Sequence, residues 1–308
     1  MEWKRDLLKI QKELFDILGQ DSVRMDEPMK EHTTFRIGGP ADLFLMPSSI
    51  EGVSRAAAYL REREIPFFIL GNGSNLLVSD KGYRGVVIQI SRRLSAIETE
   101  GTRIRAEAGA LLSRVASAAA GNSLTGMEFA SGIPGTLGGA CLMNAGAYGG
   151  EMKQVLQEVT CLSTDGVIRR TGPEDMGLSY RHSAFTDSGD VILSAVLSLK
   201  EGDPAGIRAR MDELKAMRTS KQPLDLPSAG STFKRPEGYF AGKLIMDAGL
   251  RGYRVGDAQV SEKHCGFVVN RGEATARDVW TLIKDVRERV LKDAGVELVP
   301  EVRFLGEF

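Results

Sequence analysis

The stretch from residue 125 to residue 150, TGMEFASGIPGTLGGACLMNAGAYGG, is the densest glycine region of the chain and most constrains its fold. Glycine is required where the backbone approaches another group closely or adopts a positive φ, and packing alone rarely needs so many. Ile133, Leu137 and Met143 make the stretch too apolar for a flexible surface loop, which is the competing interpretation. We therefore expect this backbone to lie against a ligand.

A second glycine-containing loop, GNGSNLL at residues 71–77, directly follows the apolar run PFFIL. It nearly matches the dinucleotide-binding fingerprint, but Leu76 takes the place of the third glycine and no helical pattern follows, so a Rossmann interpretation fails. Converging backbone N–H groups and the side chains of Asn72, Ser74 and Asn75 suit an anion nest. Taken alone, a tight turn is the stronger interpretation. Together, the two loops favour a diphosphate attached to a large planar group.

Helical and strand patterns alternate along the chain. Asp203 precedes Pro204 as an N-cap precedes a first-turn proline, and we place the main domain boundary here. Thr275 and Asp278 have the spacing of a capping box. The expected helices are residues 1–18, 48–64, 111–120, 204–218 and a long helix from 275. The expected strands are residues 66–70, 86–90, a segment near 159, 191–199, 266–270 and 301–305, with a hairpin around 97 and 104.

The bulk properties exclude several classes of protein. A chain of 308 residues is too long for one compact core and suits two or three lobes. The net charge of -1, with acids and bases interspersed, argues against a nucleic-acid-binding or membrane-surface protein. No segment approaches the roughly 20 apolar residues that span a bilayer, and the charged N-terminus lacks a signal-peptide core. The scattered cysteines and histidines favour neither a disulfide framework nor a metal site, so a cytoplasmic location is expected.

Three polar side chains are candidates for chemistry, and each has a plain structural alternative. Arg181 in SYRHSAF carries a planar fork suited to a carboxylate or phosphate, although for this motif alone a solvated arginine is favoured. Ser231 in PSAGSTFKRP is able to donate a proton or to cap a turn, and the turn is favoured without further information. Glu301 in PEVRF is by itself typical of a solvated carboxylate.

In combination, these segments resemble the UDP-N-acetylenolpyruvoylglucosamine reductase family. The resemblance runs from about residue 30 to residue 306, and the order and spacing of the motifs make chance a poor explanation. The uninterrupted run between Ser179 and Lys221 suggests the shorter form of the family, which lacks an extra tyrosine-bearing loop. The matching motifs are HTTFRIGGPAD, GNGSNLLVSD, GMEFASGIPGTLGGACLMNAGAYGGEM, YRHSAF, KQPLDLPSAGSTFKRP, AGKLIMDAGLRGYRVGDAQVSEKHCGFVVN and LVPEVRFLG.

The resemblance implies an α+β fold. A two-lobed FAD-binding module of the vanillyl-alcohol-oxidase type would occupy residues 1–92 and 93–204, and a C-terminal α+β substrate-binding domain would occupy residues 205–308. FAD would be bound non-covalently, because neither His32 nor Cys141 lies in a linkage motif. The implied FAD contacts are Arg36, Gly71, Asn72, Gly73, Ser74, Asn75, Leu76, Gly132, Ile133, Pro134, Gly138, Gly139 and Asn144.

The implied reaction is the NADPH-dependent, FAD-mediated reduction of UDP-N-acetylglucosamine enolpyruvate to UDP-N-acetylmuramate in peptidoglycan biosynthesis. By motif position, the resemblance makes Ser231 the proton donor, while Arg181 and Glu301 stabilise charge that develops at the substrate carboxylate. The expected partners are the UDP-sugar and NADPH, with no nucleic acid and no membrane insertion. The implied substrate contacts are Tyr180, Lys221 and His264.

Two competing functions stay open on the sequence. A flavin oxidase or dehydrogenase with the same module is disfavoured by the motifs around Ser231 and Glu301. A non-catalytic protein that binds a UDP-sugar or nucleotide would be colourless and would not bind FAD. Arg235 stands where some relatives carry Asn, so its role is left open. Cys265 stands where a small alanine is expected, and we interpret it as a buried core residue.

Overall fold

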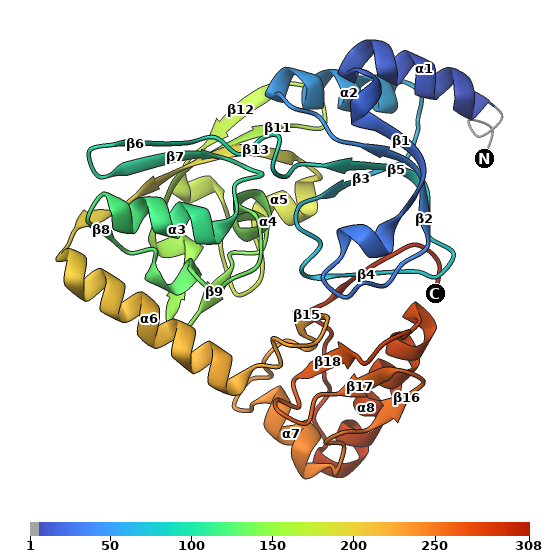
Figure 1. Ribbon diagram of the computed structural model, residues 1–308, viewed down its shortest axis with the longest axis vertical. Coiled ribbons are helices and arrows are strands. Elements are labelled where there is room, and N and C mark those ends of the chain that lie inside the picture. The colour runs from blue at the N-terminus through green and yellow to red at the C-terminus, as the bar shows by residue number, and fades with distance from the viewer. Residues whose placement is uncertain (1–5) are drawn as a thin grey trace. The chain divides into compact units, whose positions relative to one another are not determined.

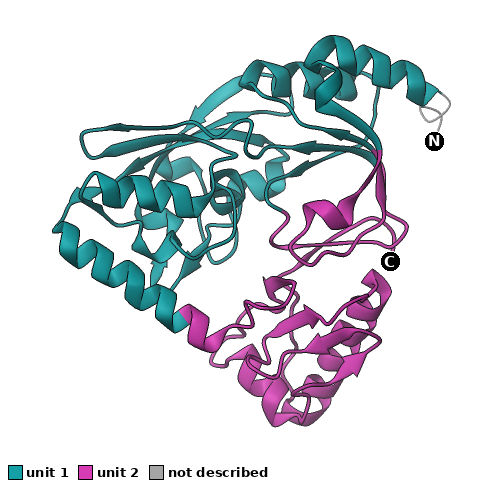
Figure 2. Cartoon of the chain, in the orientation of Figure 1, with its two compact units in different colours: residues 1–25, 43–72, 85–217 teal, residues 26–42, 73–84, 218–308 magenta. Residues whose placement is uncertain are grey.

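The computed structural model describes residues 6–308, which form two compact units (Figure 2). Unit 1 contains the residues up to 25 together with residues 43–72 and 85–217. Unit 2 contains residues 26–42, 73–84 and 218–308. The chain passes from one unit to the other several times, and the last passage lies inside helix α6 (Pro204–Lys221).

The first sheet has four strands in the order β1 (Val23–Pro28), β2 (Pro40–Leu45), β5 (Tyr83–Gln89) and β3 (Phe67–Leu70), with β3 parallel to β5. The helices beside it are α1 (Leu7–Leu18) and α2 (Ile50–Glu62) (Figure 1). Leu14 of α1 and Leu60 of α2 are buried in one cluster with Leu43 and Ile88 of the sheet. These apolar contacts hold both helices on the strands of unit 1.

The second sheet has five antiparallel strands in the order β12 (Ile168–Thr171), β11 (Leu156–Leu162), β13 (Val191–Ser198), β7 (Arg103–Glu107) and β6 (Ile97–Glu100). Its accompanying helices are α3 (Leu112–Gly121) and α4 (Leu137–Leu142). Leu193 of the central strand, Val115 of α3 and Leu137 of α4 are fully buried in one core. The side-chain burial of β13 is nearly continuous, as expected for a central strand that is covered on both faces.

Short elements connect these layers in unit 1. They are η2 (Gln20–Ser22), β8 (Leu124–Thr125), η4 (Glu128–Ala130), β9 (Gly146–Ala147), β10 (Gly150–Glu151), η5 (Met152–Gln154), η6 (Pro173–Asp175), α5 (Ala184–Ser188) and β14 (Lys200–Glu201). β8 pairs with β14, and β9 pairs with β10.

Unit 2 is built around a four-stranded antiparallel sheet in the order β15 (Ser228–Ser231), β18 (Phe267–Asn270), β17 (Ala258–Val260) and β16 (Arg254–Val255). The other elements of this unit are η3 (Met29–His32), β4 (Leu76–Val78), α7 (Ala241–Asp247), α8 (Ala276–Ala294) and β19 (Arg303–Leu305). β19 pairs in parallel with β4, so the end of the chain forms a sheet with a segment from its first third. Ile283 of α8 and Leu77 of β4 belong to the same buried cluster.

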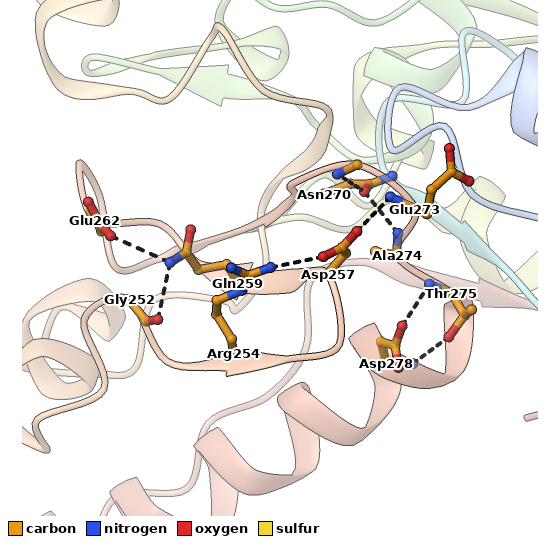
Figure 3. A network of polar contacts seen from close by, with 11 residues as sticks. Gly252, Arg254, Asp257, Gln259, Glu262, Asn270, Glu273, Ala274, Thr275 and Asp278 are labelled. Atoms are coloured by element: carbon orange, nitrogen blue, oxygen red, sulfur yellow. Dashed lines mark hydrogen bonds and ion pairs between the residues drawn. The ribbon is translucent and has the colours of Figure 1, made fainter.

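Polar side chains join the turns of unit 2 (Figure 3). Gln259 donates to the carbonyl of Gly252 at 3.1 Å, and Asp257 accepts from the backbone N–H of Glu273 at 3.0 Å. Asn270 accepts from the backbone N–H groups of Gly272 at 2.9 Å and Ala274 at 3.1 Å. These contacts fix the loops at the ends of β16, β17 and β18.

The expected helices and strands agree with the structure over most of the chain. Ser49 caps α2, and Asp203 accepts from the N–H of Gly206 at 2.8 Å at the start of α6. The first five residues of the expected N-terminal helix lie outside the described residues. The main disagreement is α4, because the glycine-rich stretch is not all loop but forms a helix from Leu137 to Leu142. Between residues 6 and 308, no helix is long and apolar enough to cross a membrane.

The N-terminus of α8 has two sources of capping. Thr275 and Asp278 form the expected capping box, and the carboxylate of Asp80 accepts from the backbone N–H groups of Ala276 at 2.7 Å and Arg277 at 3.0 Å. The first N–H groups of a helix have no partner within the helix, and a carboxylate there is also favoured by the helix dipole. Asp80 therefore stabilises a helix that lies far from it in the sequence.

We expect Asp80→Ala to lower the free energy of unfolding by about 1 kcal/mol, as is typical for the loss of a capping side chain. Chemical denaturation followed by circular dichroism measures this difference. Lys81→Ala is the control, because Lys81 makes only an exposed ion pair with Glu307 at 3.8 Å and such pairs contribute little. An unchanged denaturation midpoint in Asp80→Ala would contradict the assignment.

Candidate active site

Ser231 and Glu301 lie on adjacent segments of unit 2. Ser231 ends β15 and is exposed, while Glu301 is partly buried. The residue between them in space is Thr232, whose N–H donates to Gly266 at 2.8 Å and whose carbonyl accepts from the N–H of Glu301 at 2.8 Å. The segment that carries the predicted proton donor and the segment that carries the predicted carboxylate are therefore joined by the backbone hydrogen bond between Glu301 and Thr232.

Residues 73–77 of the glycine-containing loop contribute to the same part of unit 2. The side-chain amide of Asn75 donates to the carbonyl of Glu301 at 3.0 Å, and the N–H of Arg303 donates to the carbonyl of Asn75 at 3.1 Å. Gly73 has a φ of 61°, and a Cβ there would overlap the carbonyl oxygen of His32. This part of the loop thus requires glycine at residue 73, and it holds the Glu301 segment through Asn75.

Arg36 lies on a loop that is joined to β15. It is exposed and has a φ of 57°. The hydroxyl of Thr34 donates to the carbonyl of Ser228 at 2.6 Å, and the amide of Asn270 donates to the carbonyl of Phe35 at 3.2 Å. The side chains of Thr34 and Asn270 therefore fix the backbone that carries Arg36.

His264 and Lys221 occupy different positions in unit 2. Lys221 ends α6 and is exposed. His264 is partly buried, and its Nδ1 accepts from the N–H of Gly266 at 3.1 Å. Burial lowers the pKa of His264 and so favours the neutral ring, and the hydrogen bond accepted at Nδ1 leaves the proton of that form on Nε2, where it is able to donate. Cys265 is buried in the core, as the sequence indicates.

The glycine-rich stretch approaches a neighbouring backbone in unit 1. The N–H groups of Leu137 and Gly138 donate to the carbonyls of Ala110 and Ala108, each at 2.8 Å. A Cβ on Gly138 would lie 2.9 Å from the Cβ of Ala108, whereas a Cβ on Gly139 would meet only the hydroxyl of Thr136 at 3.6 Å. Gly138 is thus required for packing, and Gly139 has open space on its outer side.

Two predicted loops meet in unit 1. The amide of Asn72 donates to the carbonyl of Pro134 at 2.6 Å, and a Cβ on Gly71 would overlap the hydroxyl of Thr136. Gly132 and Pro134 are exposed and Ile133 is partly buried, so this segment presents small groups and backbone to its surroundings. Such a surface fits a ligand that contacts peptide groups, as a diphosphate does.

Arg181 lies at the tip of a tight turn in unit 1. Ser179 and His182 exchange both backbone hydrogen bonds across this turn, and Arg181 has a φ of 55°. Its guanidinium donates to the carbonyl of Gly146 at 3.2 Å and lies 5.0 Å from the centroid of the exposed Tyr180 ring. The turn presents an arginine and a phenol side by side.

Several residues of the site region were missed by the sequence analysis. Thr34, Thr136 and Glu151 were not selected, although each lies within two residues of a quoted motif or inside one. Their side chains contact the backbone or side chains of predicted residues, and no local pattern marks such contacts. The roles of the selected residues stay predictions, whereas their positions are as described above.

Comparison with protein families first defines the class. Residues 41–172 match the FAD binding domain family model, and residues 222–305 match the model of the UDP-N-acetylenolpyruvoylglucosamine reductase C-terminal domain. The α+β fold of two sheets followed by a third agrees with this combination, as the resemblance implies. The chain is therefore a flavoprotein with an FAD-binding module and a C-terminal substrate domain.

The particular family follows from the relatives. A UDP-N-acetylenolpyruvoylglucosamine reductase of Agathobacter rectalis is 56% identical, and the match covers 96% of this chain and 98% of the relative. One from Caldanaerobacter subterraneus subsp. tengcongensis is 53% identical over 96% of this chain and 97% of the relative. This chain belongs to the UDP-N-acetylenolpyruvoylglucosamine reductase family.

Solved structures agree with this assignment. The crystal structure of the reductase from Thermus caldophilus is 36% identical and matches with a TM-score of 0.80, covering 92% of this chain and 98% of that chain. The 4-ethylphenol oxidase from Gulosibacter chungangensis matches with a TM-score of 0.51 at 15% identity, covering 96% of this chain and 65% of that chain. The second likeness is one of fold alone.

We expect Gly138→Val to lower the free energy of unfolding by about 1–3 kcal/mol, because the new side chain is forced against Ala108 in a packed region. Gly139→Ala is the control, since its Cβ makes only an ordinary contact and alanine favours the helix. Thermal and denaturant unfolding of both variants test this difference. Equal stabilities would show that α4 does not pack as described.

Proposed function

We propose that this protein reduces the enolpyruvyl group of UDP-N-acetylglucosamine enolpyruvate to give UDP-N-acetylmuramate for peptidoglycan synthesis, with NADPH as the reductant. The observation that carries the proposal is the joining of Ser231 and Glu301 through Thr232, within the region that matches the C-terminal domain of this reductase family. A hydroxyl donor and a carboxylate on adjacent segments suit a reaction that adds a proton beside a developing negative charge.

When bound, FAD would supply the redox chemistry that links NADPH to the substrate. Gly139 has open space on its outer side, and Gly132 and Pro134 are exposed, so this part of the loop leaves room for a ligand. We propose that backbone N–H groups of the two loops, together with polar side chains, bind the diphosphate. The proposed FAD contacts are Arg36, Gly71, Asn72, Gly73, Ser74, Asn75, Leu76, Gly132, Ile133, Pro134, Gly138, Gly139 and Asn144.

The protein's own residues polarise the substrate and move a proton. Hydride addition to an electron-rich enol ether is difficult unless the attached carboxylate accepts charge. In the proposal, Arg181 donates hydrogen bonds to this carboxylate and Glu301 stabilises the same charged region, so that stabilisation is greatest where charge develops. Ser231 then donates a proton to the carbon that bears the carboxylate.

The remaining assignments concern substrate contacts, domains and location. Tyr180, Lys221 and His264 are proposed to contact the substrate, and the neutral His264 would do so as a hydrogen-bond donor.

The division into lobes 1–92 and 93–204 and a substrate domain 205–308 is kept as a proposal. We also propose a cytoplasmic location, where the free thiols of Cys141, Cys161 and Cys265 would stay reduced.

The absorbance spectrum of the purified protein tests the proposed function. We expect a bound flavin whose visible absorbance is bleached by NADPH and restored, without oxygen, by the UDP-linked enolpyruvyl sugar. Acid precipitation should release the flavin into the supernatant, because the binding is non-covalent. Gly138→Val should purify without flavin, since it displaces a proposed contact loop. A colourless wild-type protein that does not bind added FAD would contradict the proposal.

We expect Ser231→Ala to separate the two half-reactions. Flavin reduction by NADPH should stay near the wild-type rate, whereas re-oxidation by the enolpyruvyl sugar should slow by at least the ~10²-fold that is typical of losing a general acid. Ser231→Cys should recover part of the rate, because a thiol also donates a proton. Stopped-flow absorbance measures both phases. Equal slowing of the two phases, with lower stability, would identify Ser231 as a structural residue at the end of β15.

A further inference from the structure

Asn144 makes three hydrogen bonds while being almost fully buried in unit 1. Its relative exposure is 1%, and its φ is 42°. The side-chain amide donates to Oε2 of Glu151 at 3.1 Å and to the carbonyl of Ser179 at 3.0 Å, while Oδ1 accepts from the N–H of Lys153 at 2.9 Å. Both amide protons are thus used within the protein, which leaves the side chain no donor for a ligand.

Two of the three partners of Asn144, Ser179 and Glu151, lead to Arg181. Ser179 begins the turn that carries Arg181, and its carbonyl also accepts from the N–H of His182 at 3.2 Å. Glu151 pairs with Gly146 in the β9–β10 hairpin, and the carbonyl of Gly146 accepts from the Arg181 guanidinium. Asn144 therefore joins the base of the turn to the hairpin that holds the end of the Arg181 side chain.

The turn needs this support because of its backbone geometry. Arg181 has a positive φ, which is unfavourable for residues other than glycine and asparagine and persists only where the surroundings enforce it. The Ser179–His182 pair supplies two backbone bonds, and Asn144 supplies the side-chain bond to the Ser179 carbonyl. The carboxylate of Glu151 accepts the other hydrogen bond from the Asn144 amide, and a carboxylate acceptor makes such a bond stronger.

We propose that Asn144, together with Glu151, is a positioning residue that fixes the Arg181 turn for the reaction. The inference rests on the proposed function for its catalytic consequence, but its structural part concerns this turn alone. The FAD contact proposed for Asn144 would then fall to its backbone, because both amide hydrogens of its side chain are used within the protein. Small displacements of a charged group from its reactive position are enough to slow a reaction by orders of magnitude.

The first test is structural and requires no substrate. Hydrogen exchange of the peptide segment 178–185, followed by mass spectrometry, should be faster in Asn144→Ala than in the wild-type holoenzyme, because the amides of Ser179 and His182 lose the fixed turn. Asn122→Ala is the matched control: its amide also donates to a backbone carbonyl, that of Ala118, at 2.8 Å, but at the end of α3. It should leave segment 178–185 unchanged. Unchanged exchange in Asn144→Ala would overturn the proposal.

The second test is kinetic. In flavin-loaded Asn144→Ala, re-oxidation by the enolpyruvyl sugar should slow on the order of 10²-fold more than reduction by NADPH does. Equal slowing of both phases would assign Asn144 to the FAD site alone and overturn the proposal. If the wild-type flavin is not re-oxidised by this sugar, the proposed function is wrong. The hydrogen-exchange experiment on segment 178–185 then still tests whether Asn144 fixes the Arg181 turn.

Exchanging the hydrogen-bond donor and acceptor between Asn144 and Glu151 distinguishes a positioning role from a general loss of stability. Asn144→Asp removes both donors and places a carboxylate against that of Glu151, so re-oxidation should be slower than in the wild type. Adding Glu151→Gln supplies a donor from the other side, and the double variant should be faster than Asn144→Asp alone, as a coupled pair requires. The absence of any recovery, with the double variant folded and flavin-bound, would contradict a direct Asn144–Glu151 coupling.

Discussion

Close approach of one backbone segment to another at glycine is the constraint on which the loops of both units depend. In unit 1, Gly138 lies against Ala108 and Gly71 lies against Thr136. In unit 2, Gly73 lies against the carbonyl of His32 and Gly82 against that of Pro40. A Cβ at any of these positions would meet an atom at a distance that real Cβ contacts rarely show, so the loops keep their form only with glycine there.

Side chains that take no part in the proposed proton transfer also fix the conformation of these loops. Thr34 and Asn270 hold the loop of Arg36, Asn75 holds the carbonyl of Glu301, and Asn144 holds the turn of Arg181. All of them bind to backbone carbonyl groups. A buried carbonyl that lost such a partner would cost free energy, so these side chains determine one loop conformation over others.

Much of the fold was accessible from local patterns because those patterns have local causes. Asp203 and the Thr275–Asp278 pair were identified as caps, and each accepts the expected N–H in the structure. The helix from Leu137 was missed because its glycines indicate close approach and a loop equally well. In the helix, Gly138 packs against Ala108, whereas Gly139 has open space on its outer side.

The sequence alone determined the caps, the periodic helices and strands, and the motifs around Arg181, Ser231 and Glu301. Only the tertiary structure decided that β19 pairs with β4, that Thr232 joins Ser231 to Glu301, and that Asp80 caps α8. The physical reason is the separation along the sequence over which each interaction acts. Capping and amphipathic periodicity depend on neighbours within about four residues. A hydrogen bond between distant segments depends on how the whole chain packs, and no short pattern encodes it.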